Sequence, residues 1–437
     1  MKTKTAKPNK VNVVTLGCSK NLVDSENIIT QLKANDYEVM HDSNEEAGIV
    51  IVNTCGFIDL AKEESIQTIL NYAHLKSLGM IDKLYVTGCL SHRYKSDLER
   101  EIPEVDAYFG TMELPGLMAK LNADYKHELI GERWITTPSH YAYLKISEGC
   151  NRTCSFCAIP LMRGNHISKP IESLVKEAKH LASMGTKEII LIAQELTYYG
   201  LDIYKRRALG DLLNALCEVA GIEWIRLHYA YPSKFPVDVL DVIQAQDKVC
   251  KYLDIPLQHA SDTMLSAMKR QITRDEQRDL IKTIRNRVPG ITIRSTFLVG
   301  FPGETEEDFE VLLDFIRESR LERVGVFQYS HEEGTSAFSM KDDVDTDVKA
   351  ERANRLMEVQ QEISLATNLA MVGKEMKVLI DRKEGDFFIG RTEFDSPEVD
   401  NEVLIPADRF YVRVGDFARV SIIDADEYDL HAEVLPA

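Results

Sequence analysis

The sequence lacks any apolar run of the length that a membrane-spanning helix requires. About 20 consecutive apolar residues are needed to cross a bilayer, and none of its hydrophobic stretches approaches that length. The basic N-terminus, Met1 to Lys10, is followed by a short apolar run that passes directly into Gly17 and Cys18. This pattern is typical of a first β-strand rather than of a signal peptide. We therefore expect a cytoplasmic protein without membrane association.

Basic residues are too few to balance the acidic ones. The 437 residues contain 52 Lys and Arg against 70 Asp and Glu, which gives a formal net charge of −18. A protein that grips bare nucleic acid neutralises phosphates with Lys and Arg, so this balance has the wrong sign for that role. An acidic surface suits a basic protein partner. Direct nucleic-acid binding is therefore not favoured.

Cysteine is scarce, with only eight residues in the chain. Without a predicted export signal we expect all eight to stay reduced, which favours metal binding or catalysis over disulfides. Cys217, inside a helical pattern, and Cys250 have no partner cysteines nearby in the sequence. Free cysteine is often simply buried, so we interpret both as packing residues. The other six fall into two groups of three.

The densest group is Cys150, Cys154 and Cys157, at the spacing C-x3-C-x2-C just after a strand-like run over 141–146. Three thiolates in one short loop can hold three corners of a cubane iron–sulfur cluster and leave the fourth iron open. An open position is a place for chemistry, as in catalytic zinc sites. A disulfide loop and a three-cysteine zinc site, with His166 as the nearest further ligand, are the alternatives. The spacing favours the cluster.

The second group lies in residues 1–130, where strand-like and amphipathic helical segments alternate. This alternation predicts an α/β domain with a doubly wound parallel sheet. Cys18, Cys55 and Cys89 each follow a predicted strand at once, and ligands bind beyond the carboxyl ends of such strands. Three thiols at three strand ends can meet at one site, although three separately buried thiols would give the same pattern. The strands are expected over 11–16, 37–40, 48–53, 83–87 and 105–109.

The segment 136–368 continues with six strand-and-helix repeats. Because eight repeats close a full barrel, we predict a partial, open-sided (β/α)6 barrel with its site at the carboxyl ends of the strands. The strands are expected over 141–146, 188–193, 224–229, 252–256, 291–299 and 324–329. Candidate ligand contacts here are Gln194, Glu195 and Arg294, each of which could equally be a satisfied strand-end residue. Gly300, Pro302 and Gly303 are further candidates, although their glycine-rich segment could be only a tight turn. His259 and His331 are interpreted as satisfied loop histidines.

After a helix expected over 345–369, residues 370–437 change to short alternating strands separated by Gly, Asp and Pro turns. Small all-β Greek-key barrels of the OB type have this pattern, and many bind nucleic acid. Residues 371–437 carry eight Lys and Arg against sixteen Asp and Glu, a net charge of −8. This charge favours a basic protein over nucleic acid as the partner of the barrel.

The three parts, in this order, resemble the methylthiotransferases of the radical S-adenosylmethionine (SAM) superfamily. Those enzymes carry an N-terminal three-cysteine domain, a radical SAM barrel and a C-terminal TRAM domain. One branch modifies an adenosine of tRNA, and the other the β-carbon of an aspartate in small-subunit ribosomal protein twelve. The second branch is matched by residues 16–26, 55–58, 63–66, 143–149, 253–259 and 391–400. Glu195, where Asp is more usual, and His331, where Pro is frequent, depart from the pattern.

The resemblance implies two 4Fe–4S clusters and SAM as cofactors. Cys150, Cys154 and Cys157 would hold the cluster whose free iron chelates SAM. Its reductive cleavage would give a 5′-deoxyadenosyl radical that abstracts hydrogen from an unactivated C–H bond. The SAM contacts would come from Gln194, Glu195, Arg294, Gly300, Pro302 and Gly303.

The resemblance also assigns Cys18, Cys55 and Cys89 to an auxiliary cluster with its own open iron, the source or carrier of the methylthio group, while a second SAM supplies the methyl. The implied partners are a basic ribosomal protein, free or within the ribosomal particle, and an electron donor. A tRNA methylthiotransferase is the alternative, but it would need a basic face that the charge disfavours. A non-enzymatic metal-binding protein is disfavoured by two open triplets.

Overall fold

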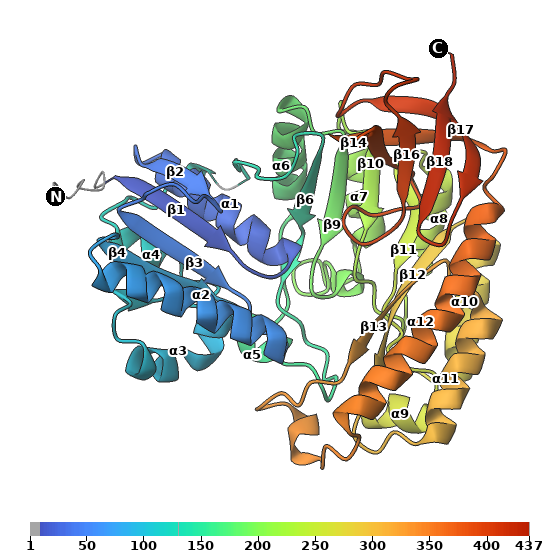
Figure 1. The fold of residues 1–437 in the computed structure, drawn as a ribbon, viewed down its shortest axis with the longest axis horizontal. Helices are drawn as coiled ribbons and strands as arrows, with labels where there is room; N and C mark the ends of the chain where they lie inside the picture. Colours follow the sequence, from blue (N-terminus) through green and yellow to red (C-terminus); the bar gives the residue numbers. More distant parts are fainter. Residues whose placement is uncertain (1–8, 130, 437) are drawn as a thin grey trace.

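The computed structural model describes residues 9–129 and 131–436 (Figure 1). Residues 1–8 lie outside the described residues, and they include most of the basic N-terminus that was distinguished from a signal peptide. Residue 130, the expected end of the first domain, also lies outside them. Figure 1 shows an N-terminal α/β part, a central α/β part and a small C-terminal β-barrel on one end of the central part. The predicted fold class is confirmed. No helix among the described residues has the length and apolar character needed to cross a membrane.

The N-terminal domain is a parallel sheet with strand order β2-β1-β3-β4-β5. Its strands are β1 (Lys10–Thr15), β2 (Glu38–His41), β3 (Ile49–Thr54), β4 (Lys83–Gly88) and β5 (Ala107–Tyr108). Helices α1 (Ser19–Lys33) and α4 (Leu114–Lys120) pack on one face, and α2 (Asp59–Ser77) and α3 (Cys89–Glu101) on the other. The central strand β3 is buried on both faces, as parallel strands usually are. The sheet is therefore doubly wound, as predicted.

The central domain has, within the described residues, a six-stranded parallel sheet in the order β13-β12-β11-β10-β9-β6. Its strands are β6 (Tyr141–Lys145), β9 (Glu188–Ile192), β10 (Trp224–Leu227), β11 (Val249–Asp254), β12 (Thr292–Val299) and β13 (Arg323–Gln328). Because β13 and β6 are not paired with each other, the partial barrel is open on one side, as predicted. The outer face forms the largest core, which also buries Cys217.

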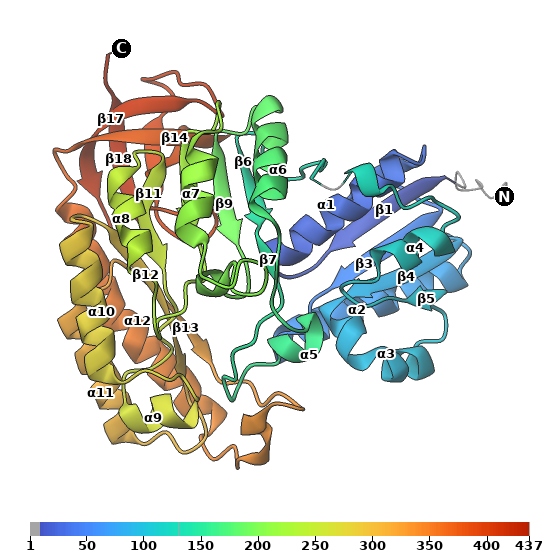
Figure 2. The same cartoon turned by 180° about the vertical axis from the view of Figure 1, so that it is seen from behind.

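Helices cover this outer face (Figures 1 and 2). They are α6 (Ile171–Ser183), α7 (Leu209–Cys217), α8 (Asp238–Ala245), α10 (Arg274–Arg287) and α11 (Glu306–Ser319). Capping boxes, Thr273 with Glu276 and Thr305 with Asp308, fix the starts of α10 and α11 by satisfying backbone N–H groups that a helix leaves unpaired. Several short elements were not predicted from the sequence, namely α4, α5 (Ile159–Arg163), α9 (Asp262–Ala267) and the pair β7 (Ser147–Glu148) and β8 (Ile167–Ser168).

The long helix α12 (Thr346–Leu369) leads into a closed barrel with strand order β14-β15-β16-β18-β17. The strands are β14 (Glu375–Glu384), β15 (Phe387–Arg391), β16 (Glu402–Pro406), β17 (Phe417–Ala425) and β18 (Asp429–Val434). Apolar side chains such as Val378, Val403 and Ile422 fill its interior. Both the connecting helix and the small barrel follow the prediction.

The loop between β15 and β16, residues 392–401, docks the barrel onto the amino ends of the central strands. Asp395 accepts a hydrogen bond from Arg323 at 2.7 Å, and Asp400 accepts one from the hydroxyl of Tyr252 at 2.7 Å. The side chains of these carboxylates and of their partners are almost fully buried. Buried pairs of this kind are strongly destabilised when one partner is lost. The barrel is therefore fixed at the end of the central sheet opposite the carboxyl ends of its strands.

A second contact near this interface surrounds Cys250. Its thiol packs with Trp224 and Tyr252 of the central sheet and with Leu379 of the barrel. The packing role that the sequence predicts for Cys217 and Cys250 is thus confirmed.

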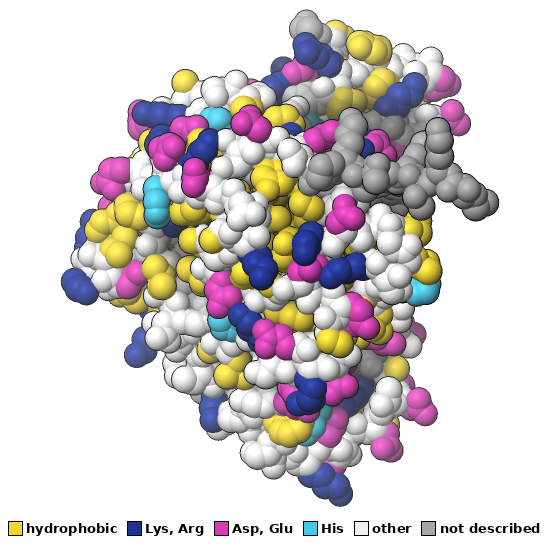
Figure 3. All heavy atoms as spheres, turned by 90° about the vertical axis from the view of Figure 1, so that its left-hand side faces the viewer, with side chains coloured by type: hydrophobic (Ala, Val, Ile, Leu, Met, Phe, Trp, Pro, Cys, Tyr) yellow, Lys and Arg dark blue, Asp and Glu magenta, His cyan; other side chains and the backbone are white. Residues whose placement is uncertain are grey.

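Figure 3 views the molecule from the side of the N-terminal domain, where acidic and basic side chains of the described residues are intermingled.

Candidate active site

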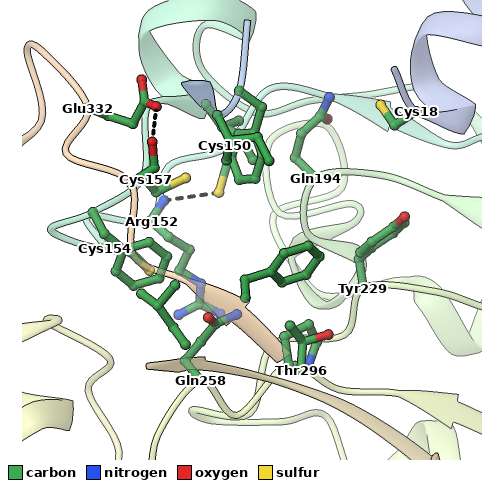
Figure 4. A pocket seen from close by; sticks show the side chains of 18 of the residues that line it. Cys18, Cys150, Arg152, Cys154, Cys157, Gln194, Tyr229, Gln258, Thr296 and Glu332 are labelled. Atoms are coloured by element: carbon green, nitrogen blue, oxygen red, sulfur yellow. Dashed lines mark hydrogen bonds between the residues drawn. The ribbon is translucent and has the colours of Figure 1, made fainter. Parts of the chain in front are cut away.

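A cavity of about 610 Å³ lies between the N-terminal and central domains. Its lining includes six cysteines, namely Cys18, Cys55, Cys89, Cys150, Cys154 and Cys157. All eight cysteines are among the described residues, and each is a free thiol. Figure 4 shows Cys18 on one side of the cavity and the 150–157 triplet on the other, with Gln194 between them. The structure thus brings together the two triplets, which are separate in the sequence.

The three N-terminal cysteines directly follow, or lie close behind, β1, β3 and β4, which are adjacent in the sheet. Glycines allow these turns to approach closely. Gly17 has φ +90°, and a Cβ built on it would lie 2.7 Å from Cβ of Cys55. Gly88 has φ +100°, and a Cβ there would lie 2.4 Å from the carbonyl oxygen of Thr54. Both positions therefore require a residue without a side chain.

The 150–157 triplet lies in a loop that backbone hydrogen bonds hold at two points. The N–H of Cys150 donates to the carbonyl of Gly164 at 3.0 Å, and the N–H of Ser155 donates to the carbonyl of Met268 at 3.1 Å. Met268 follows the short helix α9, which the sequence analysis did not identify. The loop is thus supported from a distant part of the central domain.

Burial keeps most of these thiols protonated. It raises the pKa of Cys150 to about 11 and those of Cys89 and Cys157 to about 12, and it also raises the pKa of Cys55. A thiolate, not a thiol, is the metal ligand, so a bound metal must displace these protons. An electropositive group near each triplet would assist that exchange.

Each triplet has such a group, an arginine that donates to one sulfur. Arg163 Nε donates to Sγ of Cys89 at 3.2 Å, and Arg270 donates to Sγ of Cys154 at 3.2 Å. The backbone N–H of Arg152 donates to Sγ of Cys150 at 3.4 Å (Figure 4). Donors to sulfur favour the thiolate form. Both triplets are therefore equipped to hold negative charge.

A buried polar network connects the two triplets across the domain boundary. Asp24 of α1 pairs with Lys145 and with Arg163, the latter at 2.6 Å. Glu148, beside the cysteine loop, contacts Lys145 at 2.6 Å and accepts a hydrogen bond from Gln194 at 2.7 Å. Burial alone would raise the pKa of Glu148, but the two cations beside it hold that pKa well below its usual range. The network therefore stays charged and joins the domains.

Two of the six predicted SAM contacts line the cavity. Gln194 is held by Glu148, as described above. Glu195 pairs with Arg152 at 3.0 Å and accepts a hydrogen bond from the N–H of Thr197 at 2.6 Å. The guanidinium of Arg152 is stacked 3.7 Å from the ring centroid of Tyr231. These side chains have fixed positions in the cavity wall.

The other four predicted contacts, Arg294, Gly300, Pro302 and Gly303, do not line this cavity. Arg294 lies toward the C-terminal barrel, 3.5 Å from Asp254 and 3.3 Å from Asp400. The turn from Gly300 is held by Glu304, which accepts hydrogen bonds from two of its backbone N–H groups. The structure does not bring these residues to the thiols, and their contact with SAM stays a prediction.

The zinc alternative depends on His166, which donates to or accepts from Ser168 at 3.1 Å and does not line the cavity. Among the described residues, no three His, Cys, Asp or Glu side chains are grouped for a single metal ion. His259 is fully buried, and burial lowers its pKa to about 3. His331 contacts the hydroxyl of Tyr329 at 3.1 Å. His331 is thus engaged within its loop, as predicted. His259 is only partly satisfied, because its Nδ1 accepts a hydrogen bond from the N–H of Ser261 at 2.9 Å while its buried Nε2 has no hydrogen-bond partner among the described residues.

Four cations in the cavity wall were not predicted from the sequence, namely Lys20, Arg152, Arg163 and Arg270. The first three lie in or near the cysteine motifs, and their charge was the available signal. Arg270 is 116 residues from its sulfur partner in the sequence, so only the fold reveals it.

Two residues in the cavity wall have strained backbone conformations. They are Tyr229 and Gln258, each shortly after a strand, with φ angles of +67° and +75°.

Three families match successive parts of the chain. Residues 10–110 match Uncharacterized protein family UPF0004, residues 144–316 match the radical SAM superfamily, and residues 372–435 match the TRAM domain. The Cytophaga hutchinsonii protein named ribosomal protein uS12 methylthiotransferase RimO is 60% identical over 436 residues, with 100% of both chains covered. The chain belongs to the RimO family. It is a radical SAM methylthiotransferase, as the resemblance implied.

Other RimO proteins agree over the full length. The Flavobacterium johnsoniae protein of that name is 59% identical, with 99% of this chain and 100% of its own covered. The Bacteroides thetaiotaomicron one is 52% identical, with 98% and 99% covered. These relatives are named for a protein substrate rather than for tRNA, which supports the main prediction over its alternative.

Solved structures confirm the fold more distantly. The radical SAM methyltransferase TsrM of Kitasatospora setae, solved with cobalamin and a 4Fe–4S cluster, has a TM-score of 0.54 at 16% identity, covering 74% of this chain and 75% of its own. The cobalamin-dependent SAM radical enzyme OxsB has a TM-score of 0.52 at 13% identity, covering 80% and 56%. At these identities the likeness concerns the fold alone.

Proposed function

We propose that this chain attaches a methylthio group to the β-carbon of an aspartate in ribosomal protein uS12, inside the cavity between its two cysteine triplets. The single observation that carries this proposal is that all six motif cysteines line one cavity as free thiols. Full-length identity of 60% to a protein named for this activity supports it. Cytoplasmic location is part of the proposal, because the ribosome is there.

The residues present fit two iron–sulfur clusters. Each triplet offers three thiols toward the cavity, the ligand that such clusters select. Cys18, Cys55 and Cys89 would hold the auxiliary cluster, and Cys150, Cys154 and Cys157 the radical SAM cluster. When bound, the two clusters and SAM supply the one-electron reduction, the hydrogen abstraction and the sulfur and methyl that protein side chains cannot supply.

The chain's own groups position these parts. Arg163 and Arg270 each hold one ligating sulfur at 3.2 Å and offset its negative charge. Gln194 and Glu195 form the wall between the triplets, where we place contacts to SAM. Apolar side chains in the lining, among them Phe156 and Leu298, exclude water from a site that must protect a radical.

The substrate is expected to meet the acidic C-terminal barrel, whose net charge of −8 is complementary to a basic ribosomal protein. The intermingled charges on the N-terminal face (Figure 3) support a protein rather than a nucleic-acid partner. We propose domain limits of 1–130, 136–368 and 370–437. The protein acts on uS12, free or within the ribosomal particle, and receives electrons from a separate donor.

The test compares two triplet variants, Cys55→Ala and Cys150→Ala, with the matched control Cys217→Ala, which changes a packing cysteine. After anaerobic reconstitution, each triplet variant should lose about half of the bound iron and the control none. Cys150→Ala should also lose SAM cleavage, while Cys55→Ala should cleave SAM without methylthiolating a uS12 peptide. Full iron or persistent SAM cleavage in Cys150→Ala would contradict the assignment.

A further inference from the structure

Lys20 places a buried positive charge in the cavity. It is the second residue of α1, two residues after Cys18, and it lines the cavity. Only 9% of Lys20 is exposed. Its Nζ lies 3.0 Å from the ring centroid of Tyr229, which follows β10 of the central domain. The ammonium group is therefore held at the boundary between the domains by a cation–π contact.

Among the described residues, Lys20 is the cavity-lining cation without a hydrogen bond or ion pair. Arg152 pairs with Glu195, Arg163 with Asp24, and Arg270 donates to a thiol and a carbonyl. An ammonium removed from water without an anionic partner is costly. A buried lysine of this kind is therefore a candidate binding group for an anionic ligand.

The nearby carboxylates are already engaged. Glu332 in the cavity wall pairs with Arg93 at 2.7 Å and with Lys62 at 3.0 Å. Asp254, which is also buried, lies 3.5 Å from Arg294 and accepts a hydrogen bond from the N–H of Tyr229. These acids therefore have other partners, and the ammonium of Lys20 faces the cavity.

The N-terminus of α1 adds to this positive charge. Helix α1 has 15 residues, begins at Ser19 and has no acidic residue in its first turn. Cys18 precedes it in an extended conformation, and no described side chain caps the helix. The unsatisfied N–H groups of a helix start carry a partial positive charge that favours anions. The start of α1 and the buried ammonium of Lys20 thus both favour an anion in the cavity that Cys18 and Lys20 line.

We propose that Lys20 binds the side-chain carboxylate of the substrate aspartate and thereby determines which residue is modified. The proposal rests on the proposed function. The carboxylate is bonded directly to the β-carbon, so holding it near Tyr229 fixes the reacting carbon in the cavity that both triplets line. An adenine base has no carboxylate, so the same lysine selects for a protein substrate.

The test is discrimination between two uS12 peptides that differ only in Asp or Asn at the modified position. Binding is measured by fluorescence anisotropy on the reconstituted holoenzyme with SAM. The wild type should bind the Asp peptide more tightly by on the order of tenfold or more, the usual weight of a buried charge-assisted contact. Lys20→Met should bring the two affinities within about twofold of each other, and Lys20→Arg should restore part of the preference.

Lys33→Met is the matched control. Lys33 belongs to the same helix and lies 3.0 Å over the ring of Trp134, outside the cavity. The Lys33→Met variant should keep the wild-type preference for the Asp peptide. The iron content of each variant should show that it retains both clusters. If Lys20→Met still prefers the Asp peptide over the Asn peptide, the proposal is overturned. This includes the result in which both peptides bind more weakly by the same factor, which would mean that Lys20 holds SAM instead. If the wild type binds neither peptide, the proposed function fails instead.

Discussion

The guanidinium of Arg163 donates from Nε to Sγ of Cys89 across 3.2 Å, although the two residues belong to different domains. Other nitrogens of the same side chain contact Asp24 and Asn21 of α1 and Glu148 beside the second cysteine loop. One arginine therefore touches a sulfur of the auxiliary triplet and the segment that leads into the radical SAM triplet. Arg163 therefore gives the auxiliary triplet its sulfur donor and also helps to hold the two domains together.

Arg163→Gln is expected to lower the reduction potential of the auxiliary cluster, because donors to a sulfur stabilise the more negative, reduced state. Arg270→Gln should do the same for the radical SAM cluster through Cys154. The shifts should be on the order of tens of millivolts, measured by redox titration with paramagnetic resonance detection. Each variant is the control of the other. Equal shifts of both clusters in either variant would contradict separate arginine donors.

The buried contact between Arg323 and Asp395 is expected to fix the C-terminal barrel to the central domain. Asp395→Ala leaves a buried guanidinium without its partner, which should cost about 3–5 kcal/mol of unfolding free energy. Limited proteolysis should then release the barrel. Glu375→Ala, which removes an exposed pair with Arg419, is the control and should cost under about 1 kcal/mol. Equal stability of the two variants would show that the loop does not hold the barrel.

Glu148 is expected to make the domain contact sensitive to acid. The pKa of Glu148 in the folded chain lies well below 4.5. Its contribution to the free energy of unfolding is therefore fully present above about pH 4.5 and is lost as the pH falls toward about 2. Glu148→Gln should therefore lower the unfolding free energy of the metal-free chain at pH 6, by on the order of 3 kcal/mol, and less at pH 3.

The control for this pH effect is Glu132→Gln, in an exposed pair with Lys176. Urea unfolding at the two pH values gives both comparisons. A difference between wild type and Glu148→Gln that stays constant from pH 6 to pH 3 would contradict the assigned charge of Glu148.

Local patterns were sufficient to predict the two parallel sheets, the C-terminal barrel and the place of both cysteine triplets at strand ends, but not the small β7–β8 pair. The buried Ile and Val run of β3 and the cysteines that follow the strands are signals within a few residues of each other. Arg294 was also predicted to contact SAM, and this stays a prediction. In the structure Arg294 pairs with Asp400, which is 106 residues away, and pairings at such separations depend on tertiary packing. For the same reason, the sequence did not reveal the sulfur contact of Arg270.

The short elements α5 and α9 were missed because each is too brief for a helical period to be visible. Their role is nevertheless direct. Helix α5 carries Arg163 to Cys89, and α9 precedes Met268, whose carbonyl supports the 150–157 loop. Features that position the site therefore lie in segments where periodicity carries little information.

The most direct test of the central claim is the intact mass of uS12 from cells with and without this gene. The account predicts that uS12 from cells with the gene is heavier by one methylthio group in place of a hydrogen, located on a single aspartate. Complementation with Cys150→Ala should leave the lighter form. An unchanged uS12, with a methylthio group missing from tRNA in cells without the gene, would contradict the account.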